Sequence, residues 1–190
     1  MNRFTPRHLK VILLGIITVL WIDSAVAKNY IFFLHNRFLE DHSIDAAHPE
    51  YGNPSYNKII RVFEENRFVV FSEKRKANTD VREYAHKVVK QIDSLLKAGI
   101  KPNHIIVVGT SKGGYIAQFV STYLANPKVN FVIIGAYRNQ DLQKFPEVNF
   151  CGNILNIYEE SDEYGSSAVL RKQSSNCRIT HFKEINYRQD

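Results

Sequence analysis

No apolar run in this sequence is long enough to span a bilayer, which takes about 20 residues. The longest run, residues 11–22, is shorter than that and is followed by Ala-x-Ala at 25–27. Three basic residues precede it: Arg3, Arg7 and Lys10. This order is typical of a secretory signal peptide. We therefore expect residues 1–27 to be removed, leaving a secreted or periplasmic chain that begins at Lys28 and has no stable membrane span.

Cysteine is scarce, and its spacing excludes the common zinc sites. The chain of 190 residues contains Cys151 and Cys177 and no Cys-x-x-Cys pair, whereas a structural zinc site needs four ligands. In an exported protein an even pair favours a disulfide instead. Each cysteine lies just before a predicted strand, and neighbouring strands are about 4.8 Å apart. We therefore expect Cys151 and Cys177 to be joined.

The sequence also lacks linkers, repeats and clustered charge. No Pro/Gly-rich linker or internal repeat divides it, so we expect residues 28–190 to form one domain. The formal net charge is +6, and it is spread along the chain rather than gathered in one patch. Spread charge predicts a solvated basic surface, and we expect no nucleic-acid partner.

Apolar runs alternate with amphipathic segments along the rest of the chain. Several runs are apolar throughout, which is the pattern of parallel strands buried on both faces. We therefore expect an α/β fold with a mostly parallel sheet covered by helices on both faces. Ligands of such sheets bind at the carboxyl ends of the strands. The expected strands are residues 28–35, 67–73, 104–109, 129–136, 153–160 and 179–187, and the clearest helices are 57–66, 78–99, 114–126 and 167–173.

Residues 109–113 read Gly-Thr-Ser-Lys-Gly and fit the pattern Gly-x-Ser-x-Gly. A predicted strand precedes them and a predicted helix follows, which is the context of a nucleophile elbow. The elbow needs small residues where Gly109 and Gly113 stand, because strand and helix approach closely there. A phosphate-binding loop would need Lys-Ser or Lys-Thr after its glycines, and a dinucleotide fingerprint would need glycine at Ser111. We expect Ser111 to be a nucleophile and expect no cofactor; the alternative is a tight turn in which Ser111 only caps the helix.

A serine nucleophile needs a base oriented by an acid, and its oxyanion needs N–H donors. Asp162 follows a predicted strand, two strands after the elbow, where this chain order places the acid. Its alternative role is a helix N-cap. Its acidic neighbours are Glu159, Glu160 and Glu163. The expected oxyanion donors are the backbone N–H of Lys112, at the positive end of the helix dipole, and that of Asn36 or Arg37 after the first strand.

A long polar stretch, residues 36–56, follows the first predicted strand. Its length indicates a functional segment or a short helix within it. It holds several residues that could suggest a metal site: Asp41, His42, Asp45 and His48. Such a cluster is more often a solvated loop, and we expect no metal ion.

Together these residues resemble the α/β-hydrolase fold, and in particular small secreted bacterial serine hydrolase-like proteins. The resemblance runs from about Tyr30 to the last predicted strand. The elbow at residues 109–114 and the acid loop at 158–165 match it. Where family members usually have His-Gly after the first strand, this chain has His35-Asn36. The resemblance implies hydrolysis of carboxylic esters or related small acyl substrates by a Ser–acid–His triad.

The resemblance also implies a histidine after the last strand, where this sequence reads to Asp190. His104 and His181 lie at the starts of expected strands, the wrong end of a parallel sheet, and His86 lies within an expected helix. His35, on the loop that carries an oxyanion donor, is the remaining candidate substitute. We therefore expect an esterase-like fold whose C-terminal part is cut short and whose catalytic histidine is supplied beyond residue 190. The alternative, from a different class, is a non-catalytic binding protein on the same fold.

Overall fold

The computed structural model describes residues 28–162 and 164–187. The predicted signal peptide, residues 1–27, lies outside these ranges. The strands are β1 Asn29–Leu34, β2 Phe68–Phe71, β3 Ile105–Thr110, β4 Asn130–Ile134, β5 Gly152–Tyr158 and β6 Ile179–Asn186. The helices are α1 Phe38–Asp41, α2 Tyr56–Glu65, α3 Val81–Lys97, the 3-10 turn η1 Pro102–His104, α4 Lys112–Leu124, α5 Asp141–Lys144 and α6 Val169–Ser174.

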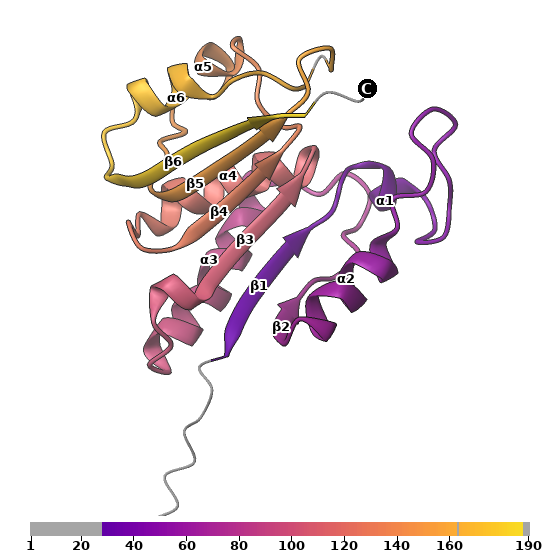
Figure 1. Ribbon diagram of the computed structural model, residues 1–190, viewed down its shortest axis with the longest axis horizontal. Coiled ribbons are helices and arrows are strands. Elements are labelled where there is room, and N and C mark those ends of the chain that lie inside the picture. The colour runs from indigo at the N-terminus through magenta and orange to yellow at the C-terminus, as the bar shows by residue number, and fades with distance from the viewer. Residues whose placement is uncertain (1–27, 163, 188–190) are drawn as a thin grey trace, which may run out of the picture.

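The six strands form one sheet in the order β2-β1-β3-β4-β5-β6 (Figure 1). Every neighbouring pair is parallel, so the predicted mostly parallel sheet is parallel throughout. The α/β class and the parallel arrangement are confirmed. Because all strands run the same way, the loops after β1, β3, β4 and β5 meet at one edge of the sheet.

Helices cover both faces of the sheet, as the apolar strands predict. Along β1, Phe32 and Leu34 belong to the larger apolar cluster, and Ile31 and Phe33 belong to the smaller one. The larger cluster includes buried residues of α3 and α4, and the smaller one is completed by α1 and α2. The alternation of side chains along a strand explains how one apolar run serves two cores.

Helix α3 begins and ends where its sequence signals lie. The Asp80 side chain accepts hydrogen bonds from the backbone N–H groups of Arg82 and Glu83, as an N-cap should. The helix ends at Lys97, just before Gly99, which has a φ of +88°. The long polar stretch after β1 contains the expected short helix, α1. Within residues 28–162 and 164–187, no helix is long and apolar enough to cross a membrane.

A disulfide joins Cys151 to Cys177, as predicted, with the two Cα atoms 5.1 Å apart. Cys151 is fully buried immediately before β5, and Cys177 lies two residues before β6. The bridge therefore ties together the starts of two neighbouring strands. For the 26-residue separation, the loop-closure model gives a stabilisation of roughly 3–4 kcal/mol.

Candidate active site

Ser111 occupies the sharp turn between β3 and α4. Its φ is 49° and its ψ is −121°, a conformation that is costly for any residue other than glycine. The turn is held by backbone hydrogen bonds: the Ser111 N–H donates to the Ile134 carbonyl at 2.9 Å, and the Gly114 N–H donates to the Ser111 carbonyl at 2.8 Å. The strand, the strained serine and the helix have the backbone geometry that a nucleophile elbow requires.

Two glycines make this turn possible. A Cβ added to Gly109 would overlap the backbone of Gly113. A Cβ added to Gly113 would overlap the Leu34 carbonyl and lie 2.6 Å from the His35 carbonyl oxygen. The start of α4 therefore packs directly on the main chain at the end of β1, and side chains are excluded from both positions.

A cavity of about 460 Å³ lies at this edge of the sheet. It brings together four residues singled out from the sequence: Asn36, Arg37, Ser111 and Asp162. Lys112 follows Ser111 directly and is the first residue of α4. Its backbone N–H belongs to the first turn of a helix, where N–H groups lack partners within the helix. The cavity is also lined by aromatic and histidine side chains: Phe38, His42, His48, Tyr51 and Tyr164.

Asp162 lies in the loop after β5. One carboxylate oxygen, Oδ1, accepts a hydrogen bond from the Tyr164 N–H at 2.9 Å. The other, Oδ2, lies 3.6 Å from where a Cβ on Gly135 would stand. Asp162 therefore forms a turn within its loop and does not cap α6, which begins at Val169.

Glu159 and Glu160, the acidic neighbours of Asp162, bind within their own loop or to β6 and do not line the cavity. The Glu159 carboxylate accepts hydrogen bonds from Ser161 within its own loop. Glu160 accepts one from the Asn186 side chain at the end of β6. Neither is part of the cavity wall, whereas Asp162 is. Glu163 lies outside the described residues.

The loop after β1 does not need glycine at position 36. Asn36 has no positive φ, and its side-chain Oδ1 accepts a hydrogen bond from the Leu39 N–H at 3.3 Å at the start of α1. Asparagine therefore starts the short helix that carries Phe38 onto the cavity wall. The His35-Asn36 departure from His-Gly is accommodated without backbone strain at residue 36.

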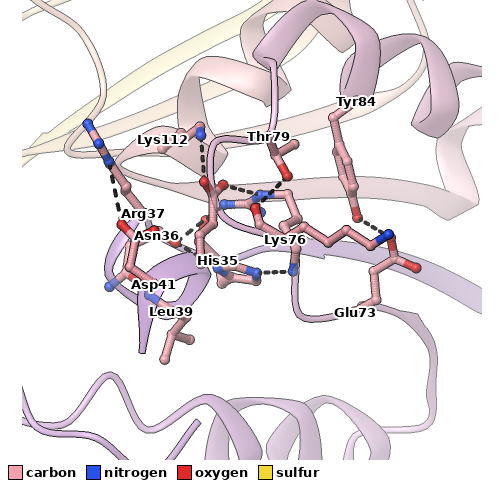
Figure 2. A network of polar contacts seen from close by, with 12 residues as sticks. His35, Asn36, Arg37, Leu39, Asp41, Glu73, Lys76, Thr79, Tyr84 and Lys112 are labelled. Carbon is pink, nitrogen blue, oxygen red and sulfur yellow. Dashed lines mark hydrogen bonds and ion pairs between the residues drawn. The ribbon is translucent and has the colours of Figure 1, made fainter. Parts of the chain in front are cut away.

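A buried ionic cluster lies beneath this loop (Figure 2). Glu40 Oε1 accepts a hydrogen bond from Arg75 Nε at 2.8 Å, and Glu40 Oε2 accepts one from Lys112 Nζ at 2.5 Å. The Glu40 and Arg75 side chains are 0% exposed. Arg75 Nη2 also donates to the His35 carbonyl, and to the Asn36 carbonyl at 3.3 Å.

His35 belongs to this cluster and is not available as a base. Its Nδ1 donates to the Asn36 carbonyl at 2.6 Å, and its Nε2 accepts from the Arg75 backbone N–H at 2.8 Å. The residue is 1% exposed. Burial, with Arg75 nearby, lowers the pKa of His35 from 6.5 to about 4. The substitute base considered from the sequence is therefore a buried neutral side chain with both nitrogens engaged.

Two histidines that sequence reasoning did not place in the site, His42 and His48, line the cavity. His42 Nδ1 donates to the Phe38 carbonyl at 3.0 Å, and the ring stacks on Phe38 with centroids 4.1 Å apart. His42 Nε2 is then the nitrogen without a proton. His48 Nδ1 accepts hydrogen bonds from the Glu50 and Tyr51 N–H groups, which places its proton on Nε2. The sequence signal was the spacing of Phe38 and His42, one helical turn apart.

The polar loop after β1 holds four potential metal ligands: Asp41, His42, Asp45 and His48. Among residues 28–162 and 164–187, no group of three or more His, Cys, Asp and Glu side chains is arranged to hold a metal ion. His42 instead stacks on Phe38, and His48 packs against both Phe38 and Tyr51. These contacts make the two histidines part of an aromatic wall.

Comparison with solved structures identifies the fold. No family model and no curated protein matches this chain. The chain is similar to an esterase/lipase from an uncultured bacterium (12% identity, TM-score 0.59, covering 85% of this chain and 67% of that one). It is also similar to SOBER1 from Arabidopsis thaliana (15%, 0.51, 84% and 89%) and to esterase B from Lactobacillus rhamnosis (15%, 0.51, 83% and 65%). The chain has the α/β-hydrolase fold, as its sequence predicts.

The lowered pKa of His35 predicts a pH dependence of stability. The unfolded chain takes up a proton near pH 6.5 and the folded chain only near pH 4, so the unfolded state binds more protons between these values. This contribution is complete above pH 6.5 and is lost as the pH falls toward 4. Its size is about 3 kcal/mol.

Chemical denaturation from pH 7.5 to pH 4 measures this contribution. The stability of the wild-type chain should fall more steeply than that of His35→Gln, because all other titrating groups are shared. Equal slopes for the two proteins would contradict the assignment of His35 as a buried neutral group.

Proposed function

We propose that this protein is a serine hydrolase that acts on carboxylic esters or related acyl substrates through Ser111. The observation that carries the proposal is the position of Ser111 on a strained strand-to-helix turn that opens into a cavity shared with Asp162. A turn that only capped a helix would need neither the positive φ nor the two crowded glycines. The similar esterases support the same reaction class, although at low sequence identity.

The proposed reaction has two steps. Ser111 Oγ attacks the acyl carbonyl carbon while a base takes its proton, and the carbonyl oxygen becomes an oxyanion. The N–H groups of Lys112 and Arg37 would stabilise this oxyanion, helped by the dipole of α4. Collapse expels the alcohol, which receives the proton from the base. Water then attacks the acyl-enzyme by the same route and releases the acid.

The base in this proposal is His42. It lines the same cavity as Ser111, and with its proton on Nδ1, its Nε2 would be the nitrogen that accepts the proton of Ser111. The Phe38 carbonyl and ring would fix its orientation. A carboxylate favours a nearby imidazolium, and Asp162 on the same wall would stabilise the positive charge that forms on the ring.

The substrate class follows from the cavity. A volume of about 460 Å³ is in the lower part of the range for small-molecule pockets. Aromatic walls suit an apolar acyl or alcohol group. The structure of esterase B is one with a C4-C4 tributyrin phosphonate, and C4 acyl chains are short. We propose short acyl esters as the first substrates to test.

The proposed site of action is outside the cytoplasm. The signal-like segment at residues 1–27 and the disulfide between Cys151 and Cys177 support this, because disulfides persist in oxidising compartments. We therefore propose that the protein is secreted or periplasmic, which can be tested separately from catalysis.

Ser111→Ala tests the nucleophile. A fluorophosphonate probe should form a covalent adduct with the wild-type protein, and the substitution should remove the labelling and the hydrolysis of p-nitrophenyl acetate. Circular dichroism should stay unchanged, because alanine removes only the hydroxyl. Wild-type protein that neither reacts with the probe nor hydrolyses esters would favour the alternative of a binding protein.

His42→Gln tests the base, with His48→Gln as the matched control from the same cavity. We expect His42→Gln to lower kcat by roughly 10²–10⁴-fold, the usual contribution of a general base. The His48 change should leave kcat within a few-fold, because its Nε2 carries the proton. A wild-type kcat in both variants would show that the base comes from another part of the protein.

Export can be checked on the protein recovered from the medium or periplasm of an expressing bacterium. Intact-mass analysis should give a chain that begins at Lys28, and thiol titration under denaturing conditions should find no free cysteine. A chain that retains residues 1–27 in the cell interior, with two titratable thiols, would contradict the proposed location.

A further inference from the structure

We propose that Glu40 and Arg75 are positioning residues of the oxyanion hole. Their buried ion pair holds the loop after β1 against the start of α4, so that the N–H groups of Arg37 and Lys112 can meet one oxyanion. The inference rests on the proposed function, since an oxyanion hole has meaning only for chemistry at Ser111. Neither Glu40 nor Arg75 lines the cavity, so both would act through the backbone.

Arg75 fixes the orientation of two successive peptide groups. Its Nη2 donates to the carbonyls of His35 and Asn36, and the His35 ring also donates to the Asn36 carbonyl. In a trans peptide, the C=O and the following N–H point in opposite directions. Because the Asn36 carbonyl is held toward the buried cluster, the Arg37 N–H points away from it.

Glu40 connects this loop to the elbow. Its two carboxylate oxygens bind different partners, Oε1 to Arg75 and Oε2 to Lys112. Lys112 is the residue whose backbone N–H is the second proposed oxyanion donor. One buried carboxylate therefore ties the segments that carry both donors.

Stability alone does not explain this cluster. Buried ion pairs are often no more stabilising than apolar residues of the same volume, because both charges must be desolvated. Arg75 Nη1 is buried and has no hydrogen-bond partner among the described residues, and such a group costs about 1–3 kcal/mol. A buried network that contains an unpartnered donor is therefore better explained by its effect on the backbone geometry of the loop after β1 than by its stability.

The cluster also accounts for asparagine at position 36. Glycine at this position, which family members usually have, gives the backbone more freedom to direct its N–H groups. In this chain the guanidinium of Arg75 fixes the peptide planes after His35 and Asn36 by donating to both carbonyls. Its planar geometry lets it bind the Glu40 carboxylate at the same time. The three N–H donors of a lysine ammonium share one tetrahedral nitrogen, so lysine lacks the planar fork that reaches the carboxylate and both carbonyls in this arrangement.

The test compares the same substitution at two buried arginines. Arg75→Lys keeps the charge beside Glu40 but removes the fork. Arg171→Lys is the matched control, because Arg171 is also buried and donates to two backbone carbonyls, Val148 at 2.8 Å and Asp141 at 2.6 Å, away from the cavity. Lys112→Met, at an 18% exposed side chain, is a second variant that cuts the Glu40 link if Arg75→Lys fails to fold.

Steady-state kinetics with p-nitrophenyl acetate gives the first readout. Arg75→Lys and Lys112→Met should lower kcat by at least about ten-fold with KM within about two-fold, since loss of an oxyanion donor costs about 10²–10³ in kcat. Arg171→Lys should lose stability without this change in kcat. Equal kcat values in the Arg75 and Arg171 variants would overturn the proposal.

Backbone NMR gives a readout that does not need activity. The amide signals of Arg37 and Lys112 should shift in Arg75→Lys and stay in place in Arg171→Lys. If the wild-type protein proves inactive toward the probe and esters, the proposed function fails, and these amide signals then show only whether the ion pair sets the geometry of the two N–H groups. Unchanged Arg37 and Lys112 signals in Arg75→Lys would overturn the positioning role.

Discussion

The contact between the start of α4 and the end of β1 leaves no room for a side chain. Gly113 lies against the carbonyls of Leu34 and His35, and Gly109 lies against Gly113. This packing forces Ser111 into its positive φ and brings the loop after β1 beside the serine. Because the strands are parallel, Asp162 in the loop after β5 lies at the same edge of the sheet as Ser111. The positions of Ser111 and of the loop after β1 depend on this one close approach.

Buried ion pairs strengthen the contact between the start of α4 and the end of β1. Glu40, Arg75 and Lys112 form the buried connection between the two segments that the glycines bring together. The neutral His35 ring completes it by bonding to Asn36 and Arg75. A histidine that looked like a substitute base from the sequence is thus part of the scaffold. The exposed face of the same loop, through Phe38 and His42, supplies the cavity wall.

Much of the fold was predictable because its signals are local. Apolar runs, several of them continuous, indicated the strands, Gly99 marked the end of α3, and the Gly-x-Ser-x-Gly spacing indicated a sharp turn at Ser111. The cysteine pair was predictable because parallel neighbours place their starts together. The ionic cluster was not, because Glu40 and Arg75 are 35 residues apart in sequence and only the fold brings them together. His42 was not identified as a base because the Phe38–His42 spacing indicates a contact only where the chain is helical, and the sequence placed the short helix no more closely than residues 36–56.

The central claim is that Ser111 and the N–H groups of Arg37 and Lys112 form one reaction site. A crystal structure of the protein after reaction with a small fluorophosphonate tests it most directly. The account predicts phosphorus bonded to Ser111 Oγ and the phosphonyl oxygen within about 3 Å of both N–H groups, the distance expected for an oxyanion hole. A phosphonyl oxygen directed away from both N–H groups, or an adduct on another residue, would contradict it.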